Sequence, residues 1–196
     1  MKAFLTILLT TTVLMAAPVT QVTLVNTGNP AQNDGKHFVG PYTLALGGQN
    51  VPVLCIDFED NTKPGDRWAA SVSDLGIDLG DTYHPDELVE YREEAYLYTM
   101  IIEPRADRVD IQHAAWAITD ASYVVDAAAA RWIAAAKDAY GTVGSTKFEI
   151  VSEVPGHAGP RRQEFLTEAV APEPYLINLL GGLLATGLAI LGRRRP

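Results

Sequence analysis

The chain is short of cysteine and of basic residues. Its 196 residues include one cysteine, Cys55, so a disulfide within the chain is excluded. Lysine and arginine number 15 against 24 aspartate and glutamate residues, a formal net charge of −9. A surface of this sign does not bind nucleic acid by neutralising phosphates. No His, Cys or acidic residues fall at zinc-site or calcium-loop spacing, so we expect neither a metal nor another cofactor.

Long apolar runs are missing from the middle of the chain and occur only near its ends. Residues 1–20 open with Lys2 and continue as an apolar run to Ala17. This run is short of the about 20 residues that a spanning helix needs. We therefore predict a cleaved signal peptide over residues 1–20, with a retained membrane-anchoring helix as the alternative.

The second apolar run, residues 175–192, has 18 residues without a charge, the lower end of the length of a membrane helix. Positive charge after the span predicts a cytoplasmic C-terminus and an external preceding domain. The motif before the run is Pro172-Glu173-Pro174, and the cluster after it is Arg193-Arg194-Arg195.

This order resembles the PEP-CTERM sorting signal of Gram-negative bacteria, placed here at residues 172–196. The resemblance implies an exosortase as the processing partner. It also implies a precursor anchored in the inner membrane through residues 175–192, followed by release to the cell surface or extracellular matrix. A plain C-terminal anchor is the alternative.

The region between the two ends is strongly acidic and reads as one domain over residues 21–154, followed by a Gly/Pro-rich linker over 155–171. Residues 21–174 carry 11 basic against 24 acidic residues, a net charge of −13, which suits a solvated exported domain. Strand patterns flank helical ones, which predicts an α+β fold: an antiparallel β-rich domain with a helical insertion. The expected strands are 21–26, Tyr42–Leu46, 51–58, 68–73 and 147–154, and the expected helices are 85–102, 108–121 and 125–140.

Cys55 lies in the strand expected over residues 51–58, in which side chains alternate between two faces. Pro52 suggests an edge strand or a strand's first residue, and residues 68–73 are expected to pair back onto this strand as a hairpin. The alternation places Leu54, Ile56 and Phe58 on one face and Val53, Cys55 and Asp57 on the other.

Two short motifs form a possible site: Leu54-Cys55-Ile56 and, in the second helix, Ile111-Gln112-His113-Ala114-Ala115-Trp116. Together they resemble the bacterial thioester domains of Gram-positive surface adhesins. The resemblance implies a β-rich domain with a helical insertion and an internal thioester between Cys55 and Gln112. An amine or hydroxyl on a surface or polysaccharide partner would attack that bond. It also implies single-use covalent attachment rather than enzymatic turnover.

The chemistry of such a bond sets geometric conditions. Because an amide is a poor electrophile, the sulfur must be held within about 3–3.5 Å of the carbonyl carbon, in a site without water. The 51–58 strand must then lie against the first half of the 108–121 helix. Trp116, four residues after Gln112, shares its helical face and is expected to cover the bond, with an ordinary core tryptophan as the alternative. Asp57 is a candidate for proton transfer at Cys55, with a plain polar strand end as its alternative.

Two other interpretations stay open. Cys55 and a histidine, His113 or His157, would form the nucleophilic pair of a cysteine hydrolase or transglutaminase-like enzyme. His113 projects about 100° away from Gln112 on the helix, and solvated histidines are the simpler reading of these residues and of His37 and His84. Alternatively, Cys55 is buried and inert in a non-reactive surface or matrix protein.

Overall fold

The computed structural model describes residues 19–28, 33–104, 107–156 and 159–169. The expected sorting signal lies outside these ranges, as does the expected signal peptide except for its last two residues. Across the described part of the chain, no helix is long and apolar enough to cross a membrane. The membrane helix expected at 175–192 therefore stays a prediction.

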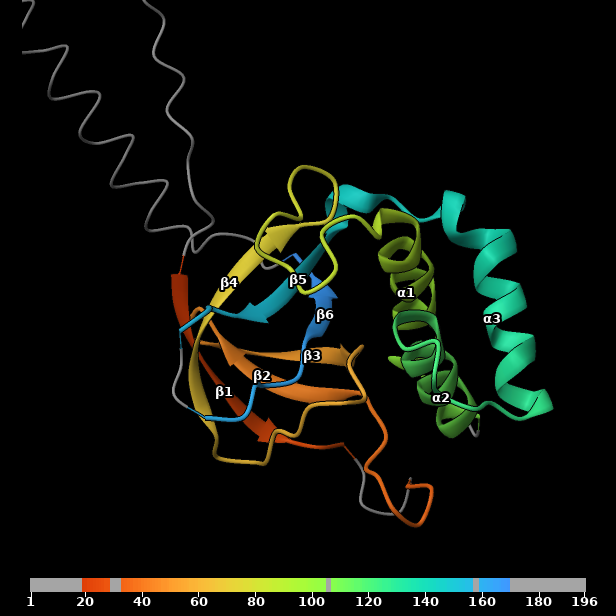
Figure 1. The fold of residues 1–196 in the computed structure, drawn as a ribbon, viewed down its shortest axis with the longest axis horizontal. Helices are drawn as coiled ribbons and strands as arrows, with labels where there is room; N and C mark the ends of the chain where they lie inside the picture. Colours follow the sequence, from red (N-terminus) through yellow and green to blue (C-terminus); the bar gives the residue numbers. More distant parts are fainter. Residues whose placement is uncertain (1–18, 29–32, 105–106, 157–158, 170–196) are drawn as a thin grey trace, which may run out of the picture.

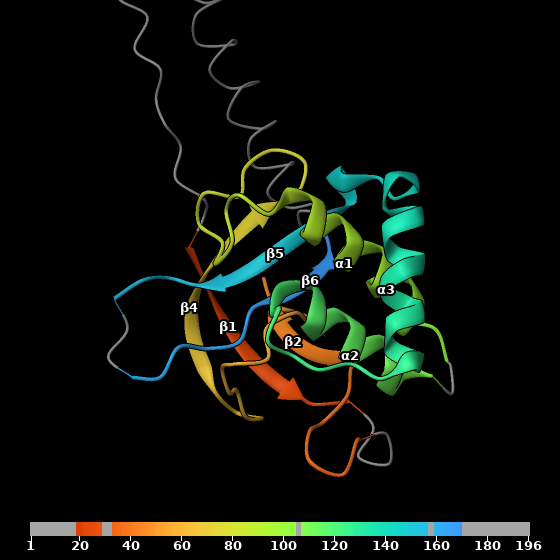
Figure 2. The same cartoon turned by 45° about the vertical axis from the view of Figure 1, so that its right-hand side comes forward.

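Six antiparallel strands close into a barrel, in the order β1-β2-β3-β6-β5-β4. Three helices follow one another between β4 and β5, so they form an insertion beside the barrel wall (Figures 1 and 2). The predicted α+β class with an antiparallel sheet and a helical insertion is confirmed. The strands are β1 (Val19–Asn26), β2 (Tyr42–Leu46), β3 (Gln49–Cys55), β4 (Arg67–Asp74), β5 (Phe148–Glu153) and β6 (Phe165–Glu168).

The helices are α1 (Leu88–Ile101), α2 (Arg108–Thr119) and α3 (Ala127–Ala139). α1 and α2 face the barrel through β3 and β6, while α3 packs on their outer side (Figure 1). α1 begins three residues later than expected, because residues 84–87 form a turn closed by a hydrogen bond from Glu87 N to His84 O. α3 begins where Asp126 accepts hydrogen bonds from the N–H groups of Ala128 and Ala129.

Strand alternation sorts the side chains into two buried clusters. Every strand contributes to the cluster inside the barrel, and the other cluster fills the space between the barrel wall and the helices. As predicted, Val53 and Cys55 face one side of β3 while Leu54 and Ile56 face the other. The predicted place of Phe58 beside Leu54 and Ile56 is wrong: β3 ends at Cys55, so the alternation stops, and Phe58 packs against the Cys55 cluster. Trp116 is the helical residue in the barrel cluster, so α2 closes this end of the barrel with an indole ring.

The predicted hairpin between 51–58 and 68–73 is wrong. β4 pairs with β1 and β5, and the second edge of β3 is taken by β6. β6 lies within residues 155–171, which the sequence analysis assigns to a linker. Its side chains from Phe165 to Thr167 are buried, and it closes the barrel between β3 and β5.

The edge-strand reading of Pro52 is also wrong, since β3 is an internal strand of a closed barrel. Pro52 pairs with Thr43 of β2, but the ladder to β6 begins only at Leu54. A missing N–H is therefore tolerated, because the paired part of β3 and β6 does not extend to Pro52. Its carbonyl oxygen accepts hydrogen bonds from the hydroxyls of Tyr98 and Thr167 instead.

Candidate functional site

Cys55 and Gln112 meet in the protein interior although they are 57 residues apart. The Gln112 side-chain Nε2 donates a hydrogen bond of 2.6 Å to the Cys55 carbonyl oxygen, and both residues are 0% exposed. Cys55 ends β3, and Gln112 lies in the second turn of α2, which packs on β3. This contact places the end of β3 against the first half of α2, as the sequence hypothesis requires of these two elements. Formation of a thioester stays a prediction.

The Gln112 amide is held at its other end by the chain before β2. The Gly40 N–H donates a hydrogen bond of 3.2 Å to Gln112 Oε1. A Cβ at position 40 would lie 3.0 Å from that oxygen and 3.3 Å from the Tyr42 ring, so only glycine brings the backbone this close. A backbone donor on the carbonyl oxygen polarises the carbonyl group, as an oxyanion-binding group does in acyl transfer.

The Cys55 sulfur lies in a dry environment. Its thiol donates a hydrogen bond of 3.2 Å to the Asp57 carbonyl oxygen. Burial raises the pKa of the thiol to about 12, while the Trp116 side chain and the hydrogen bond to Asp57 oppose this shift. The Trp116 Nε1 is buried without a hydrogen-bond acceptor among the described residues. The thiol is therefore neutral at physiological pH, and the indole N–H is the polar group available to a developing negative charge on sulfur.

An aromatic cover lies over this end of the barrel. Trp116 is 2% exposed, and the rings of His37, Phe58, His113 and Tyr123 have their centroids within 5.2–5.7 Å of its own. Trp116 and Cys55 belong to the same buried cluster. The predicted role of Trp116 as the cover of a thioester stays a prediction. Ring packing of this kind excludes water from the space beneath it.

Asp34 joins the two histidines of this cover. Its Oδ2 lies 2.9 Å from His37 Nδ1 and 3.2 Å from His113 Nε2. Burial alone would raise the pKa of Asp34, but hydrogen bonds from the His37 side chain and nearby backbone hold it below the usual range. Asp34 is therefore ionised at neutral pH and ties the 33–40 segment to α2. His113 is half-buried in this contact, so its reading as a solvated histidine is wrong.

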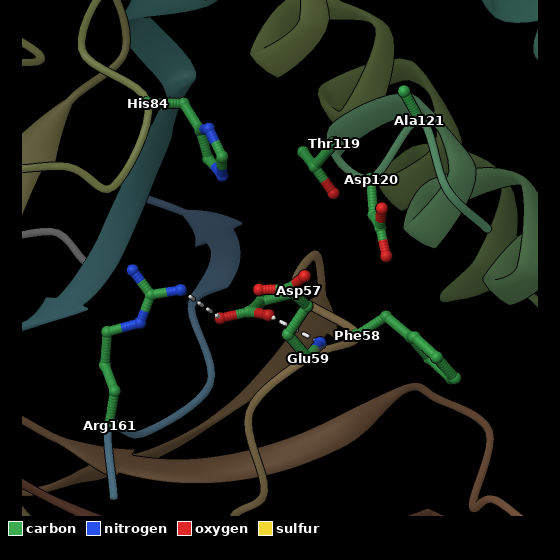
Figure 3. Close-up of a pocket in the computed structure, with 8 residues that line it drawn as sticks. All are labelled: Asp57, Phe58, Glu59, His84, Thr119, Asp120, Ala121 and Arg161. Atoms are coloured by element: carbon green, nitrogen blue, oxygen red, sulfur yellow. Dashed lines mark hydrogen bonds and ion pairs between the residues drawn. The ribbon is translucent and has the colours of Figure 1, made fainter.

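Asp57 and Phe58 line a polar cleft of about 140 Å³ next to the aromatic cover (Figure 3). Burial, with the neighbouring Asp60 carboxyl, raises the pKa of Asp57 to about 7. Its Oδ1 accepts the Glu59 N–H at 3.0 Å, and its Oδ2 lies 3.8 Å from Arg161. The carboxyl thus faces Arg161, and the contact of Asp57 with the Cys55 thiol is through its backbone oxygen. Proton transfer by the Asp57 carboxyl stays a prediction.

The cysteine–histidine alternative finds no contact in the described part of the chain. His113 and His37 turn to Asp34, and His84 lies 3.4 Å from Glu87. No described histidine forms a hydrogen bond with the Cys55 sulfur, and His157 lies outside the described residues. Within the same residues, no three His, Cys, Asp or Glu side chains group as metal ligands.

Three parts of this site are not predicted from the sequence: Gly40, Asp34 with His37, and Thr119. The Thr119 hydroxyl donates to the Ile56 carbonyl oxygen and fixes the end of α2 to the chain that follows β3. A Gly-Pro dipeptide before the strand at Tyr42 is the one local sign of special backbone geometry. Nothing in the local sequence links Asp34 to a helix that begins at Arg108.

The domain is of the α+β class. Its six-stranded barrel carries a helical insertion and is closed at one end over a buried Cys–Gln pair. No protein-family model matches the sequence, and a search of curated proteins gives no match. Among solved structures, the chain is similar to the N-terminal thioester domain of a surface protein from Clostridium perfringens. The TM-score is 0.43 with 11% sequence identity, and the alignment covers 79% of this chain and 100% of that chain.

Proposed function

We propose that Cys55 and Gln112 form an internal thioester and that the protein uses it once, to attach covalently to a partner. The observation that carries the proposal is the Gln112 amide, held between the Cys55 carbonyl and the Gly40 N–H in a site with no exposed surface. An ordinary buried glutamine needs hydrogen bonds, but it does not need the one cysteine of the chain beside it.

In the forming step, the Cys55 sulfur attacks the side-chain carbonyl carbon of Gln112. A C–S bond forms, the C–N bond breaks, and ammonia leaves with the proton of the thiol. The Gly40 N–H already faces the oxygen that becomes negative in this step. Because the thiol is neutral, orientation and the oxyanion contact supply the catalysis, rather than a standing thiolate.

In the using step, an amine or hydroxyl of a partner attacks the same carbon and becomes acylated by Gln112. The C–S bond breaks, and the proton of the nucleophile returns to the Cys55 sulfur. The Trp116 N–H faces this cluster without an acceptor and favours sulfur as a leaving group. The aromatic cover keeps water from hydrolysing the thioester before the partner binds.

The test is the intact mass of freshly folded protein at neutral pH. We expect a species lighter by one ammonia, which gains methylamine at Gln112 on incubation. Cys55→Ala and Gln112→Ala should each show the full mass of their sequence and take up no amine. Alkylation of native protein does not discriminate, because a buried thiol with a raised pKa reacts slowly in either case. Full mass, with Cys55 alkylated after acid unfolding, contradicts the proposal.

A non-reactive surface or matrix protein is the second candidate. The observation that favours it is the complete burial of Cys55, with a thiol pKa of about 12, which is also what an inert packed cysteine shows. The mass measurement separates the two, since an inert cysteine leaves the full mass unchanged.

Export and exosortase sorting belong to the proposal as well, because their motifs lie outside the described residues. Protein recovered from the cell surface should lack both residues 1–17 and the arginine cluster Arg193-Arg194-Arg195. An intact C-terminus on surface protein contradicts exosortase processing and leaves a plain membrane anchor.

A further inference from the structure

A cleft of about 220 Å³ lies against the aromatic cover of the Cys55–Gln112 pair. The Trp116 and Tyr42 rings line it, and both rings belong to the buried cluster that contains Cys55. Tyr42 also lies beside Gly40, whose N–H binds the Gln112 carbonyl. The cleft therefore lies on the outer side of two rings that pack around the buried pair.

The cleft combines flat apolar faces with neutral polar groups. Phe38, 50% exposed, and the half-buried Phe58 contribute ring faces. Asn61 and Gln163 contribute amides that both donate and accept hydrogen bonds, and threonine hydroxyls lie beside them. A sugar ring presents apolar C–H faces and hydroxyl edges, so this mixture matches a saccharide better than an apolar chain.

The charge of the cleft is opposite to that of the whole molecule. Lys36 and Lys63 line it, and no aspartate or glutamate does so among the described residues. Neither lysine forms an ion pair within the described part of the chain, although the full sequence carries a net charge of −9. The neighbouring cleft behind Phe58 is lined by three acids, Asp57, Glu59 and Asp120 (Figure 3). Two free ammonium groups on an acidic protein favour an anionic ligand and disfavour a cationic one.

We propose that this cleft is the acceptor site of the domain and that it takes a saccharide carrying carboxylate groups. The inference rests on the proposed thioester for its chemistry, but binding to the cleft does not depend on it. A saccharide hydroxyl attacks the thioester carbonyl carbon, the C–O bond forms and the C–S bond breaks. The hydroxyl proton goes to the Cys55 sulfur, and the product is an ester between the Gln112 side chain and the sugar.

Binding is measured first without chemistry, by calorimetry on the Cys55→Ala protein. The probes are a hexamer of galacturonic acid, the neutral maltohexaose and the cationic chitosan hexamer. The uronate hexamer should bind, and added salt should weaken its binding. The other two should bind at least about tenfold more weakly, a difference of about 1.4 kcal/mol. Equal binding of the three probes, or no binding of the uronate hexamer, overturns the proposal.

Variants then locate the binding. Lys36→Glu combined with Lys63→Glu should weaken the uronate complex at least about tenfold. Lys147→Glu is the control, a charge reversal at an exposed lysine outside the cleft lining, and it should leave the binding unchanged. Phe38→Ala should also weaken binding, whereas Ile77→Ala, at an 81% exposed apolar residue outside the cleft lining, should have no effect. Unchanged binding in the lysine double variant contradicts the site even if the saccharide binds elsewhere.

The covalent step is tested on wild-type protein by intact mass after incubation with the uronate hexamer. An adduct at Gln112 that hydroxylamine removes identifies the ester. Protein that starts at full mass contradicts the proposed thioester and leaves the binding results to decide the acceptor site. Protein that is lighter by one ammonia but neither binds nor acquires the hexamer contradicts the acceptor site alone.

Discussion

At the residue scale, the site depends on where the Gln112 carbonyl is held rather than on how readily Cys55 ionises. Burial disfavours the thiolate, and no described histidine contacts the sulfur. The two hydrogen bonds of the Gln112 amide, to the Cys55 carbonyl and from Gly40, are therefore the contacts that would orient the carbonyl for the proposed reaction. Of these two contacts, the one from Gly40 restricts the sequence more, because position 40 has no room for a side chain.

Gly40→Ala should slow thioester formation without unfolding the domain. The added Cβ would lie 3.0 Å from Gln112 Oε1 and 3.3 Å from the Tyr42 ring, so the amide has to move away from its donor. We expect formation at least about tenfold slower, since small displacements of a reacting group cost this much or more. The measurement is the fraction of protein lighter by one ammonia, followed over time after refolding.

Gly141→Ala is the matched control, because a Cβ at that position meets no atom within 4 Å. It should leave the rate unchanged. An unchanged rate in Gly40→Ala as well, with both proteins folded, contradicts a role for the Gly40 contact in bond formation.

At the scale of elements, α2 and the 33–40 segment form the closure of the barrel end. α2 is fixed to the β3 chain twice, by Gln112 on the Cys55 carbonyl and by Thr119 on the Ile56 carbonyl. The 33–40 segment is fixed to α2 through Asp34, which contacts His113. The segment carries Gly40 at one end and His37 against Trp116, so one carboxylate holds both the hydrogen-bond donor to Gln112 and part of the aromatic cover.

Asp34→Asn should loosen this closure and expose the proposed thioester. The side-chain amide introduced at position 34 can still form hydrogen bonds with His37 and His113. It lacks the negative charge that strengthens these bonds in the native protein. We expect methylamine to open the thioester several-fold faster, roughly a change of 1 kcal/mol in the opening free energy of the segment. The measurement is the rate of methylamine uptake by intact mass at pH 7.

Asp138→Asn, on the exposed face of α3, is the control for loss of one negative charge and should leave the uptake rate unchanged. Because hydrogen bonds from His37 hold the pKa of Asp34 below its usual range, the carboxylate stays ionised at pH 5–8 and acts throughout that window. A rate equal to wild type in Asp34→Asn contradicts the role assigned to the segment.

At the scale of the whole molecule, buried carboxyls set the pH dependence of stability. Glu94 of α1 is 0% exposed, and neither of its oxygens has a hydrogen-bond partner among the described residues. Burial raises the pKa of Glu94 well above its ordinary value. Burial likewise raises the pKa of Glu164, whose carboxylate accepts bonds from Tyr91 and Ser152, and that of Asp57 to about 7.

The free energy of unfolding should therefore fall as the pH rises from about 4.5 through 7, since the folded state holds protons that the unfolded state has released. Glu94→Gln removes one titrating group, and so reduces the difference in bound protons between the folded and unfolded states. It should flatten the fall and raise stability at pH 8 by about 1–3 kcal/mol, the range of an unsatisfied buried polar group. The measurement is urea unfolding at pH 5 and pH 8.

Glu103→Gln, at an exposed position beyond α1, should keep the wild-type pH dependence. A wild-type protein more stable at pH 8 than at pH 5 contradicts the sign of the prediction, and so does a Glu94→Gln protein less stable than wild type at pH 8.

Local patterns in the sequence determine much of this architecture. Strand alternation places Cys55 on the face of β3 opposite Leu54, and helical periodicity locates the three helices to within a few residues at each end. Period and turn chemistry act over a few neighbouring residues, so they can be read without a structure. The motifs at Cys55 and Gln112 likewise lead to the pair that the structure brings together, while the thioester stays a prediction.

Only the tertiary structure decides which strands are neighbours and what surrounds the pair. β6 is short and follows a Gly/Pro-rich segment, and its place between β3 and β5 is set by contacts with residues far away in the chain. The Gly40 donor, the Asp34 contacts and the lysine-lined cleft arise in the same way, from segments that meet only when the barrel closes. No local pattern encodes such meetings, because their free energy comes from packing and hydrogen bonds between distant residues.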